Sequence, residues 1–237
     1  MSGRLFVVGD IHGCAAELEV LLAALPLAAG DTLACLGDYC DRGPDSKRVI
    51  DLLLDLEARA TFATVFLRGN HEDMWLGFMG RDGHWGEAWI ANGGDKALAS
   101  YGLAANSVPA TVAPALPPTH LAFLDRLGLY HDTPTHLLVH AGIDPRRPFA
   151  EQDSEELLWI REPFLDAPHG LGRTIVFGHT PSREVRVDLP YKIGIDTGCV
   201  YGGALTCLSA SENYLWQVRL GSRVVQERRL PANTRRS

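Results

Sequence analysis

The first third of the chain alternates short apolar runs with longer segments that repeat apolar side chains at helical spacing. The short runs have the length of buried strands and lie at residues 4–8, 32–36 and 63–67. The longer segments predict helices over residues 15–25, 46–59 and from Glu72 onward. We expect Ser46 to be the N-cap of the second helix. The pattern therefore predicts strand–helix units whose strands deliver polar residues to one edge of a sheet.

After a short predicted helix at residues 120–127, the chain changes to successive strand-like runs. They lie at residues 137–140, 174–178, 184–187, 192–195, 204–209 and 214–219. Helices that give way to a meander predict a second sheet packed against the first. The expected architecture is a β-sandwich with helices outside.

Residues 74–118 interrupt this pattern. Three of the five tryptophans, Trp75, Trp85 and Trp89, lie among glycines in the first part of the segment. They have two interpretations, packing against the core or a cap that faces the substrate. Residues 104–118 are rich in Ala and Pro and predict a surface connector. We expect one domain over residues 1–230, with residues 74–118 as a helical cap or connector insertion and a disordered tail at residues 231–237.

Composition narrows the class of protein. The 237 residues are 46% hydrophobic and 22% charged, as in an ordinary globular protein. No apolar run reaches the roughly 18 residues of a membrane span, and no signal-peptide pattern is present, which predicts a cytoplasmic protein without a membrane partner. Five scattered cysteines without a CxxC pair are typical of reduced thiols. The net charge of −7 argues against binding of a nucleic-acid duplex.

Six short segments place Asp, His or Asn beside Gly, mostly at the ends of predicted strands. They are GDIHG at 9–13, GDYCDRG at 37–43, RGNHE at 68–72, HAG at 140–142, GHT at 178–180 and IDTGC at 195–199. Glycine allows sharp turns, so that side chains from several strands can point into one cleft. Carboxylate, amide and imidazole groups are the usual ligands of hard divalent cations. The segments therefore predict a metal cluster.

The spacing suggests how two ions would be held. Asp10 and His12 are two residues apart after a strand and can reach the same ion, and Asp38 is the natural bridging carboxylate. Three further side chains, Asn70, His140 and His179, each follow their own strand and can complete the shell of a second ion. A water held between two cations loses a proton near neutral pH and becomes a nucleophile toward phosphorus.

These segments resemble the motifs of the phosphoprotein phosphatase family within the calcineurin-like metallophosphoesterases, and the match spans roughly residues 5–200. The resemblance implies an α+β protein with the metallophosphoesterase fold, in which two packed β-sheets are flanked by helices in four αββα layers. It assigns one metal to Asp10, His12 and Asp38. It assigns the second metal to Asp38, Asn70, His140 and His179.

The resemblance also implies the groups that act on the substrate. His71 is the expected general acid, and Asp41 is expected to hold its imidazole. Arg42 and Arg161 resemble the arginines that bind phosphate in this family, and Asn70 is expected to contact both metal and substrate. IDTGC completes the pattern, but neither Asp196 nor Cys199 has an assigned chemical task. Cys40 is interpreted as a buried apolar filler, with oxidation as the alternative.

The first functional hypothesis is a phosphatase with two divalent metals that hydrolyses phosphomonoesters, of the serine/threonine protein phosphatase type. A metal-bridging hydroxide would attack the phosphorus. The alternative is a dinucleoside polyphosphate hydrolase, which cleaves diadenosine tetraphosphate. An inactive scaffold is disfavoured because every expected ligand is present. The substrate would be a phosphorylated protein or peptide, or a small phosphorylated metabolite. Mn²⁺ is the expected metal, with Fe, Zn, Co and Ni as alternatives. The oligomeric state stays open.

Overall fold

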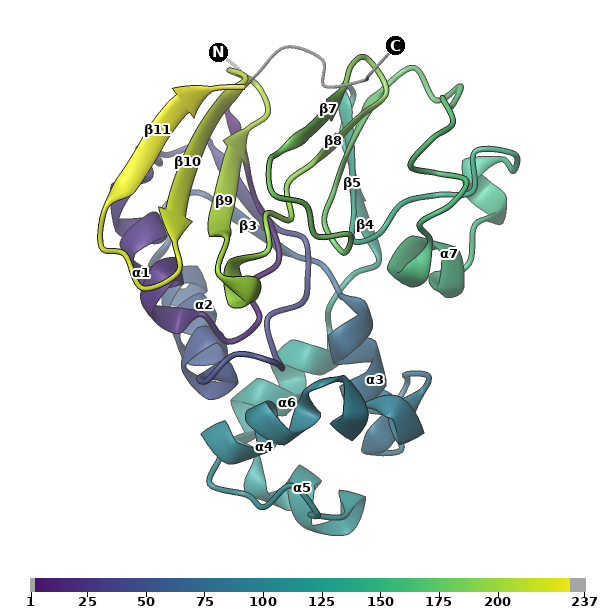
Figure 1. The fold of residues 1–237 in the computed structure, drawn as a ribbon. Helices are drawn as coiled ribbons and strands as arrows, with labels where there is room; N and C mark the ends of the chain where they lie inside the picture. The colour runs from purple at the N-terminus through teal and green to yellow at the C-terminus, as the bar shows by residue number, and fades with distance from the viewer. Residues whose placement is uncertain (1–2, 231–237) are drawn as a thin grey trace.

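The computed structural model describes residues 3–230 of the chain. The strands of these residues form two sheets that pack against each other, above a group of helices (Figure 1). The first sheet has the order β11-β10-β9-β1-β2-β3 and the second β4-β5-β6-β8-β7. The first comprises β1 (Leu5–Val8), β2 (Thr32–Cys35), β3 (Ala63–Phe66), β9 (Ala204–Ser209), β10 (Tyr214–Arg219) and β11 (Val225–Arg229). The second comprises β4 (Tyr130–Asp132), β5 (His136–Val139), β6 (Thr174–Phe177), β7 (Arg186–Asp188) and β8 (Lys192–Gly194).

The alternation of side chains along β1 explains why the sheets pack as layers. Phe6 and Val8 point to one face of the strand and join a core with α1 and α2. Leu5 and Val7 point to the other face and join a core with the second sheet. The two outer helices are α1 (Ala15–Ala24) and α2 (Ser46–Arg59).

The opposite face of the second sheet is also covered. Phe177 of β6 packs with Phe164 at a ring-centroid distance of 5.0 Å, in a core that includes Leu157 of α7 (Ser154–Trp159). Helices therefore lie outside both sheets, and the expected two-sheet fold is confirmed.

One part of the predicted topology is wrong. The runs at residues 204–209 and 214–219 do not continue the second sheet, because β9 pairs antiparallel with β1 and β10 pairs with β9. The second sheet is not a meander either, since β5, β6 and β8 pair in parallel. Apolar periodicity identifies a strand but does not reveal its partner, which depends on contacts across the whole chain.

The predicted N-cap of α2 is also wrong by one residue. The Asp45 carboxylate accepts the N–H of Arg48, so Asp45 is the N-cap. Ser46 is fully buried, and its hydroxyl accepts the N–H of Asp41. The serine therefore stabilises the loop that carries the site residues.

The segment at residues 74–118 is helical in large part. It follows the start of α3 (Asn70–Phe78) and contains η1 (Gly86–Ala88), η2 (Ile90–Asn92), α4 (Gly94–Ser100) and α5 (Pro109–Ala115), before α6 (Pro118–Asp125). The expected connector at 104–118 thus includes a helix, whose Val112 is buried. Trp75 and Trp89 stack in the core at 5.2 Å, whereas the side chain of Trp85 is 52% exposed. Core packing is therefore confirmed for Trp75 and Trp89, whereas a substrate-facing role for Trp85 stays a prediction.

The remaining short helices are η3 (Phe149–Glu151) and η4 (Cys199–Tyr201). Within residues 3–230, no helix has the length and apolar character needed to cross a membrane. The tail expected at residues 231–237 lies outside the described residues.

Candidate active site

The predicted metal ligands converge from both sheets. Asp10 and His12 follow β1, Asp38 follows β2, and Asn70 begins α3 just after β3. His140 and His179 follow β5 and β6 of the second sheet. Backbone hydrogen bonds tie these loops together, from the N–H of His12 to the carbonyl of Asp38 at 2.7 Å and from the N–H of Gly178 to the carbonyl of His140 at 2.8 Å. All six side chains are buried.

The backbone is strained where these residues lie. Seven non-glycine residues in the described part of the chain have positive φ. Five of them belong to the predicted site, namely His12, Asp38, Asp41, Arg42 and His179. Such conformations cost energy and persist where the surrounding structure enforces them, as it often does at functional sites.

Two glycines are required by the close approach of the ligand carboxylates. A Cβ atom on Gly178 would lie 2.0 Å from Oδ1 of Asp10, and one on Gly69 would lie 2.2 Å from Oδ1 of Asp38. Both distances are far below van der Waals contact. The GHT and RGNHE segments therefore need Gly at these positions to admit the carboxylates.

Asn70 lies at the centre of one ligand group. Its Oδ1 atom is 3.0 Å from Nε2 of His140 and 3.0 Å from Nδ1 of His179. Oδ1 of Asp38 lies 3.4 Å from the same Nε2 of His140. Asp38, Asn70, His140 and His179 therefore come together as predicted for the second metal.

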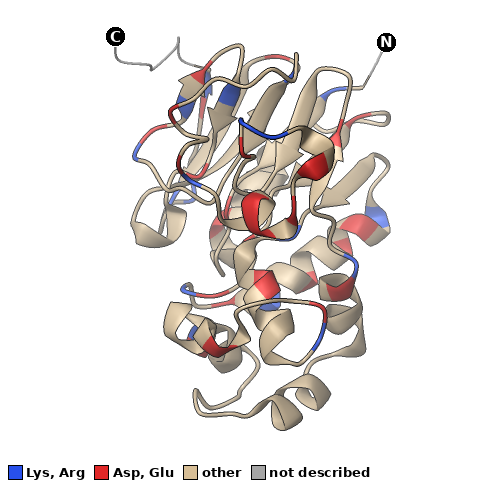
Figure 2. Ribbon diagram, turned by 90° about the vertical axis from the view of Figure 1, so that its right-hand side faces the viewer, with Lys and Arg blue, Asp and Glu red and all other residues tan. Residues whose placement is uncertain are grey.

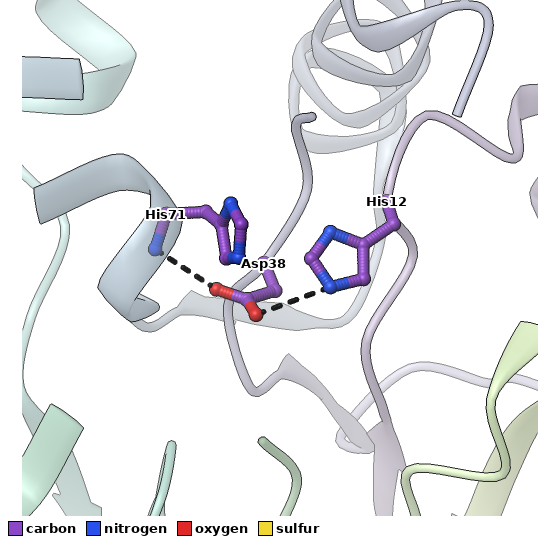
Figure 3. Close-up of side chains that lie close together, drawn as sticks. All are labelled: His12, Asp38 and His71. Carbon is purple, nitrogen blue, oxygen red and sulfur yellow. Dashed lines mark hydrogen bonds and ion pairs between the residues drawn. The ribbon is translucent and has the colours of Figure 1, made fainter. Parts of the chain in front are cut away.

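Asp38 also joins the other group. Its Oδ2 atom lies 3.3 Å from Nε2 of His12, and Figure 3 shows the carboxylate between His12 and His71. Oδ2 of Asp10 accepts the backbone N–H of His179 at 3.0 Å. Burial raises the pKa of Asp10 well above the usual value, and the charges of Asp196 and Asp38 raise it further. Asp38 is thus placed between both ligand groups.

The donor chemistry fits divalent cations. Nδ1 of His140 lies 3.0 Å from the Leu36 carbonyl, which makes Nδ1 the donor and leaves a lone pair on Nε2 when the ring is neutral. That lone pair faces two further acceptors, the oxygens of Asn70 and Asp38, and a cation among them would resolve the repulsion. Burial lowers the pKa of His140, and it lowers the pKa of His179 to about 3, so both rings are neutral and able to bind metal.

The electrostatics of Asp38 point the same way. Burial opposes ionisation of this carboxyl, but the neighbouring imidazoles of His140, His71 and His12 hold its pKa well below the usual range. Several buried carboxylates lie close together here, since Asp38 and Asp196 both raise the pKa of Asp10. A buried cluster of negative charge needs cations nearby to remain ionised. The residues present therefore fit divalent metal ions.

His71 and Asp41 form the predicted pair. Nδ1 of His71 lies 2.7 Å from Oδ2 of Asp41, and both residues have no exposed surface. Nε1 of Trp89 donates to Oδ2 of Asp41 at 2.9 Å and to Oδ1 at 3.1 Å. The ring atom Nε2 of His71 is buried without a hydrogen-bond partner among the described residues. The backbone N–H of His71 donates to Oδ1 of Asp38. The imidazole is thus fixed beside the Asp38 carboxylate, and its Nε2 atom has no partner in the described part of the chain.

The two predicted arginines differ in their surroundings. Arg42 is half-buried, with Nη1 2.8 Å from Nε2 of His12 and its guanidinium over the ring of Tyr201 at 5.7 Å. Arg161 is exposed and lies on the loop after α7, where its charge contributes to lowering the pKa of His179. Arg42 therefore contacts a predicted metal ligand, whereas Arg161 lies two positions after Trp159, whose ring is 6.1 Å from that of His179.

The structure adds residues that the sequence pattern did not identify. The Glu72 carboxylate is fully buried and accepts the N–H groups of Asp38, Tyr39, Cys40 and Gly69 at 2.8 to 3.1 Å. In the sequence, only the position of Glu72 as the last residue of RGNHE indicated a role in the site. Glu72 shapes the GDYCDRG loop, because a carboxylate that accepts several N–H groups fixes the backbone around it.

Cys40 contacts the same carboxylate. Its Sγ lies 3.1 Å from Oε1 of Glu72, and burial raises the pKa of the thiol well above the usual value, with Asp41 and Glu72 acting in the same direction. A protonated donor thiol suits the interpretation as a buried filler better than a reactive thiolate. Asp196 is buried and accepts the N–H of Gly198, so it stabilises its own loop.

Comparison with known proteins adds to this geometry. A family model for the calcineurin-like phosphoesterases matches residues 3–214. The chain belongs to this family. The calcineurin-like phosphoesterase is 34% identical over 209 residues to serine/threonine-protein phosphatase 1 of Salmonella typhimurium, covering 86% of the chain and 90% of the relative. It is 30% identical over 234 residues to bis(5'-nucleosyl)-tetraphosphatase PrpE (asymmetrical) of Bacillus anthracis, covering 87% and 90%.

A solved structure agrees with these relatives. The crystal structure of a candidate diadenosine tetraphosphatase superposes on this phosphoesterase with a TM-score of 0.71 and 28% identity, covering 93% of this chain and 95% of that one. The family and the fold that the six segments implied are therefore confirmed. The phosphoesterase is a hydrolase of phosphoric esters, whereas the roles of its individual site residues stay predictions.

Proposed function

We propose that this phosphoesterase is a dinuclear-metal-dependent phosphatase that hydrolyses phosphomonoesters, and that its substrates are phosphoserine and phosphothreonine residues of proteins. One observation supports the mechanism above the others: a carboxylate shared by two ligand groups lies next to a buried histidine–aspartate pair. The first set of groups suits metal-assisted attack and the second suits protonation of a leaving group.

The proposed metal site uses the ligands described above. Asp10, His12 and Asp38 would hold one ion, while Asp38, Asn70, His140 and His179 would hold the other. When bound, two divalent ions polarise the phosphoryl oxygens and acidify a water molecule. Mn²⁺ is our choice for the assay, since donor sets of oxygen and nitrogen accept several metals.

The side chains of the chain itself account for the rest of the proposed reaction. Arg42 and Arg161 bind phosphoryl oxygens and neutralise the charge that builds up in the transition state. His71 gives its Nε2 proton to the leaving oxygen. Asp41 holds the Nδ1–H of His71, which fixes the tautomer and stabilises the protonated imidazole. The N–H of Trp89 fixes Asp41 in turn.

The second candidate function is hydrolysis of dinucleoside polyphosphates, which the name of the Bacillus anthracis relative favours. Both reactions need the same metal ligands, so the site itself does not separate them. An assay panel with Mn²⁺ tests the proposal, comparing phosphoserine, phosphothreonine and phosphotyrosine peptides with diadenosine tetraphosphate and polyphosphate. We expect the highest kcat/KM for phosphoserine or phosphothreonine peptides. A higher value for diadenosine tetraphosphate would contradict the proposal.

A further inference from the structure

Three neighbouring cavities beside α7 share the side chains of Glu155 and Trp159. Their volumes are about 290, 320 and 580 Å³. Because they share these two residues, they form one continuous surface, which we call the α7 groove. The residues of the groove that matter here are Asp73, Trp85, Asp153, Glu155, Trp159 and Arg161.

The α7 groove begins at the candidate active site. The Trp159 ring lies edge-on to the ring of His179 at a centroid distance of 6.1 Å. The N–H of Ala141, in the HAG segment, donates to the Leu157 carbonyl of α7 at 2.9 Å. Arg161 follows Trp159 by two positions and lines the same groove. A substrate with its phosphate at the metal ligands would therefore extend past Trp159.

The charge of the groove is mainly negative. Asp153 accepts the N–H groups of Glu155 and Glu156, and among the described residues no basic side chain pairs with Glu155. Figure 2 looks onto the side of the molecule that bears α7 and shows red acidic segments there. Carboxylates that lack a partner cation attract a positively charged ligand.

Nearby basic residues do not cancel this charge. Arg146 is paired with Asp144 at 2.7 Å, and Arg147 is paired with Glu156. Both arginines are therefore paired with carboxylates, including Arg146, which itself lines the groove. Arg161 differs, since among the described residues no carboxylate lies within ion-pair distance of it. One guanidinium without a carboxylate partner in the groove suits a single phosphoryl group better than a chain of them.

The groove also presents two indoles. Trp85 is 52% exposed and has a φ of 56°, an unfavourable conformation for a large side chain, while Trp159 is half-buried. An exposed tryptophan held in such a conformation suggests a binding role. Indole faces attract Lys and Arg side chains through cation–π contacts, and carboxylates beside them add to this attraction.

A nucleotide fits this surface less well. Indoles also stack on bases, but a dinucleoside polyphosphate would carry several phosphates along a groove that contains Asp153 and Glu155. Like charges across an interface are unfavourable and exclude wrong partners. A cationic side chain, by contrast, gains from the indoles and the carboxylates together.

We propose that the α7 groove binds a Lys or Arg side chain of the phosphorylated peptide, a few residues away from the phosphorylated residue. The inference rests on the proposed protein phosphatase function and specifies its substrate as a basic phosphopeptide. An extended chain advances about 3.3 Å per residue, so a side chain two positions from the phosphoserine spans about the 6.1 Å between the His179 and Trp159 rings. Glu155 and Trp85 are its proposed specificity residues.

Peptide kinetics with the full-length, Mn²⁺-loaded protein test the inference. The substrates are phosphoserine peptides of one sequence in which Arg, Ala or Glu occupies each position from −4 to +4. We expect Arg to raise kcat/KM about five- to tenfold over Glu in at least one position, the combined effect of one cation–π contact and one exposed ion pair. Glu155→Lys should abolish or invert the preference, and Trp85→Ala should reduce it, whereas Trp85→Tyr should retain part of it.

Glu151→Gln serves as the matched control, because Glu151 is exposed four residues from Glu155 and does not line the groove. It should leave the preference unchanged. Cleavage of all peptides at equal rates would overturn the inference while leaving the phosphatase function intact. If the Glu155 and Trp85 variants lost kcat/KM by the same factor for every peptide, the inference would be overturned as well. Cleavage of diadenosine tetraphosphate without cleavage of any peptide would overturn both the inference and the proposed function.

Discussion

Nδ1 of His71 lies 2.7 Å from Oδ2 of Asp41, with both side chains fully buried and the indole N–H of Trp89 donating to the same carboxylate. This arrangement keeps one proton on Nδ1 for Asp41, so the proton that His71 would give to a leaving group is a second one, on Nε2. The other nitrogen, Nε2, is buried and lacks a hydrogen-bond partner within the described residues. A general acid requires such a fixed nitrogen that no other protein group occupies.

Asp41→Asn should therefore lower kcat, because an asparagine amide can donate to Nδ1 and stabilise the wrong tautomer. We expect a loss of roughly 10²–10⁴-fold, the usual range for an acid–base group, and a similar loss in His71→Asn. The double variant should be little worse than either single variant, since the two residues act as one unit. Turnover measured beside metal content tests this, and independent losses that multiply in the double variant would exclude a shared role.

Arg42→Ala should weaken phosphate binding. A charged hydrogen bond contributes about 1.5–3 kcal/mol, so the inhibition constant of inorganic phosphate should rise about tenfold or more, together with a fall in kcat. Arg42→Lys should recover only part of this, because lysine cannot make two parallel contacts. Arg48→Ala is the control, since Arg48 is exposed and pairs with Glu19 on the helical side. Unchanged phosphate inhibition in Arg42→Ala would remove this residue from phosphate binding.

A buried histidine away from the site should make stability depend on pH. His120 of α6 has its Nε2 atom 3.0 Å from Asp51 of α2 and its Nδ1 atom 2.8 Å from the Tyr101 hydroxyl. Burial lowers the pKa of His120, although Asp51 acts in the opposite direction. The unfolded chain therefore binds a proton at His120 more readily than the folded protein does. The folding free energy that depends on the neutral imidazole is lost as pH falls below the unfolded pKa of about 6.5.

We expect the free energy of unfolding of the native protein to fall more steeply between pH 7 and pH 5 than that of His120→Gln. Urea titrations at both pH values measure this difference. His131→Gln, at a half-buried position in β4, provides the control and should retain the native slope. Equal slopes in the native protein and His120→Gln would show that His120 does not contribute.

The parts of the fold that could be predicted from sequence are those that local periodicity determines. The strand at 32–36 and the helix at 46–59 match β2 and α2 closely, since alternating or helical apolar spacing determines each one. The pairing of β9 with β1 depends on residues about 200 positions apart, such as Val7 and Leu208, and no local pattern encodes it. The α5 helix at 109–115 contains an internal proline and has little periodicity, so it was missed.

In the candidate site too, local sequence predicts some residues, whereas others depend on tertiary contacts. Side chains that bind metal or move protons occur in short motifs, and the structure brings the predicted ones together, including Asn70 with His140 and His179. Supporting residues lack such motifs. Trp89 donates to Asp41 from 48 positions away, and Trp159 meets His179 only because α7 packs beside the HAG loop. These contacts depend on tertiary packing and required the structure.

Removal of the metal should abolish turnover. Dialysis against a chelator should leave an inactive protein, because without cations the buried carboxylates and imidazoles cannot polarise the phosphoryl group. Added Mn²⁺ should restore activity, and the fold should persist throughout, since both sheets have apolar cores independent of the ligands. Circular dichroism before and after chelation checks this second expectation, and a collapse of the spectrum would assign the metals a structural role instead.

Metal stoichiometry measured together with turnover, in the native protein and in Asp38→Asn, tests the central claim most directly. Asp38 contacts both ligand groups, through Oδ2 to His12 and Oδ1 to His140. We predict about two Mn²⁺ ions per active native chain, and loss or weakening of both ions together with turnover in Asp38→Asn. Full turnover in metal-free native protein, or two bound ions with full activity in Asp38→Asn, would contradict the account.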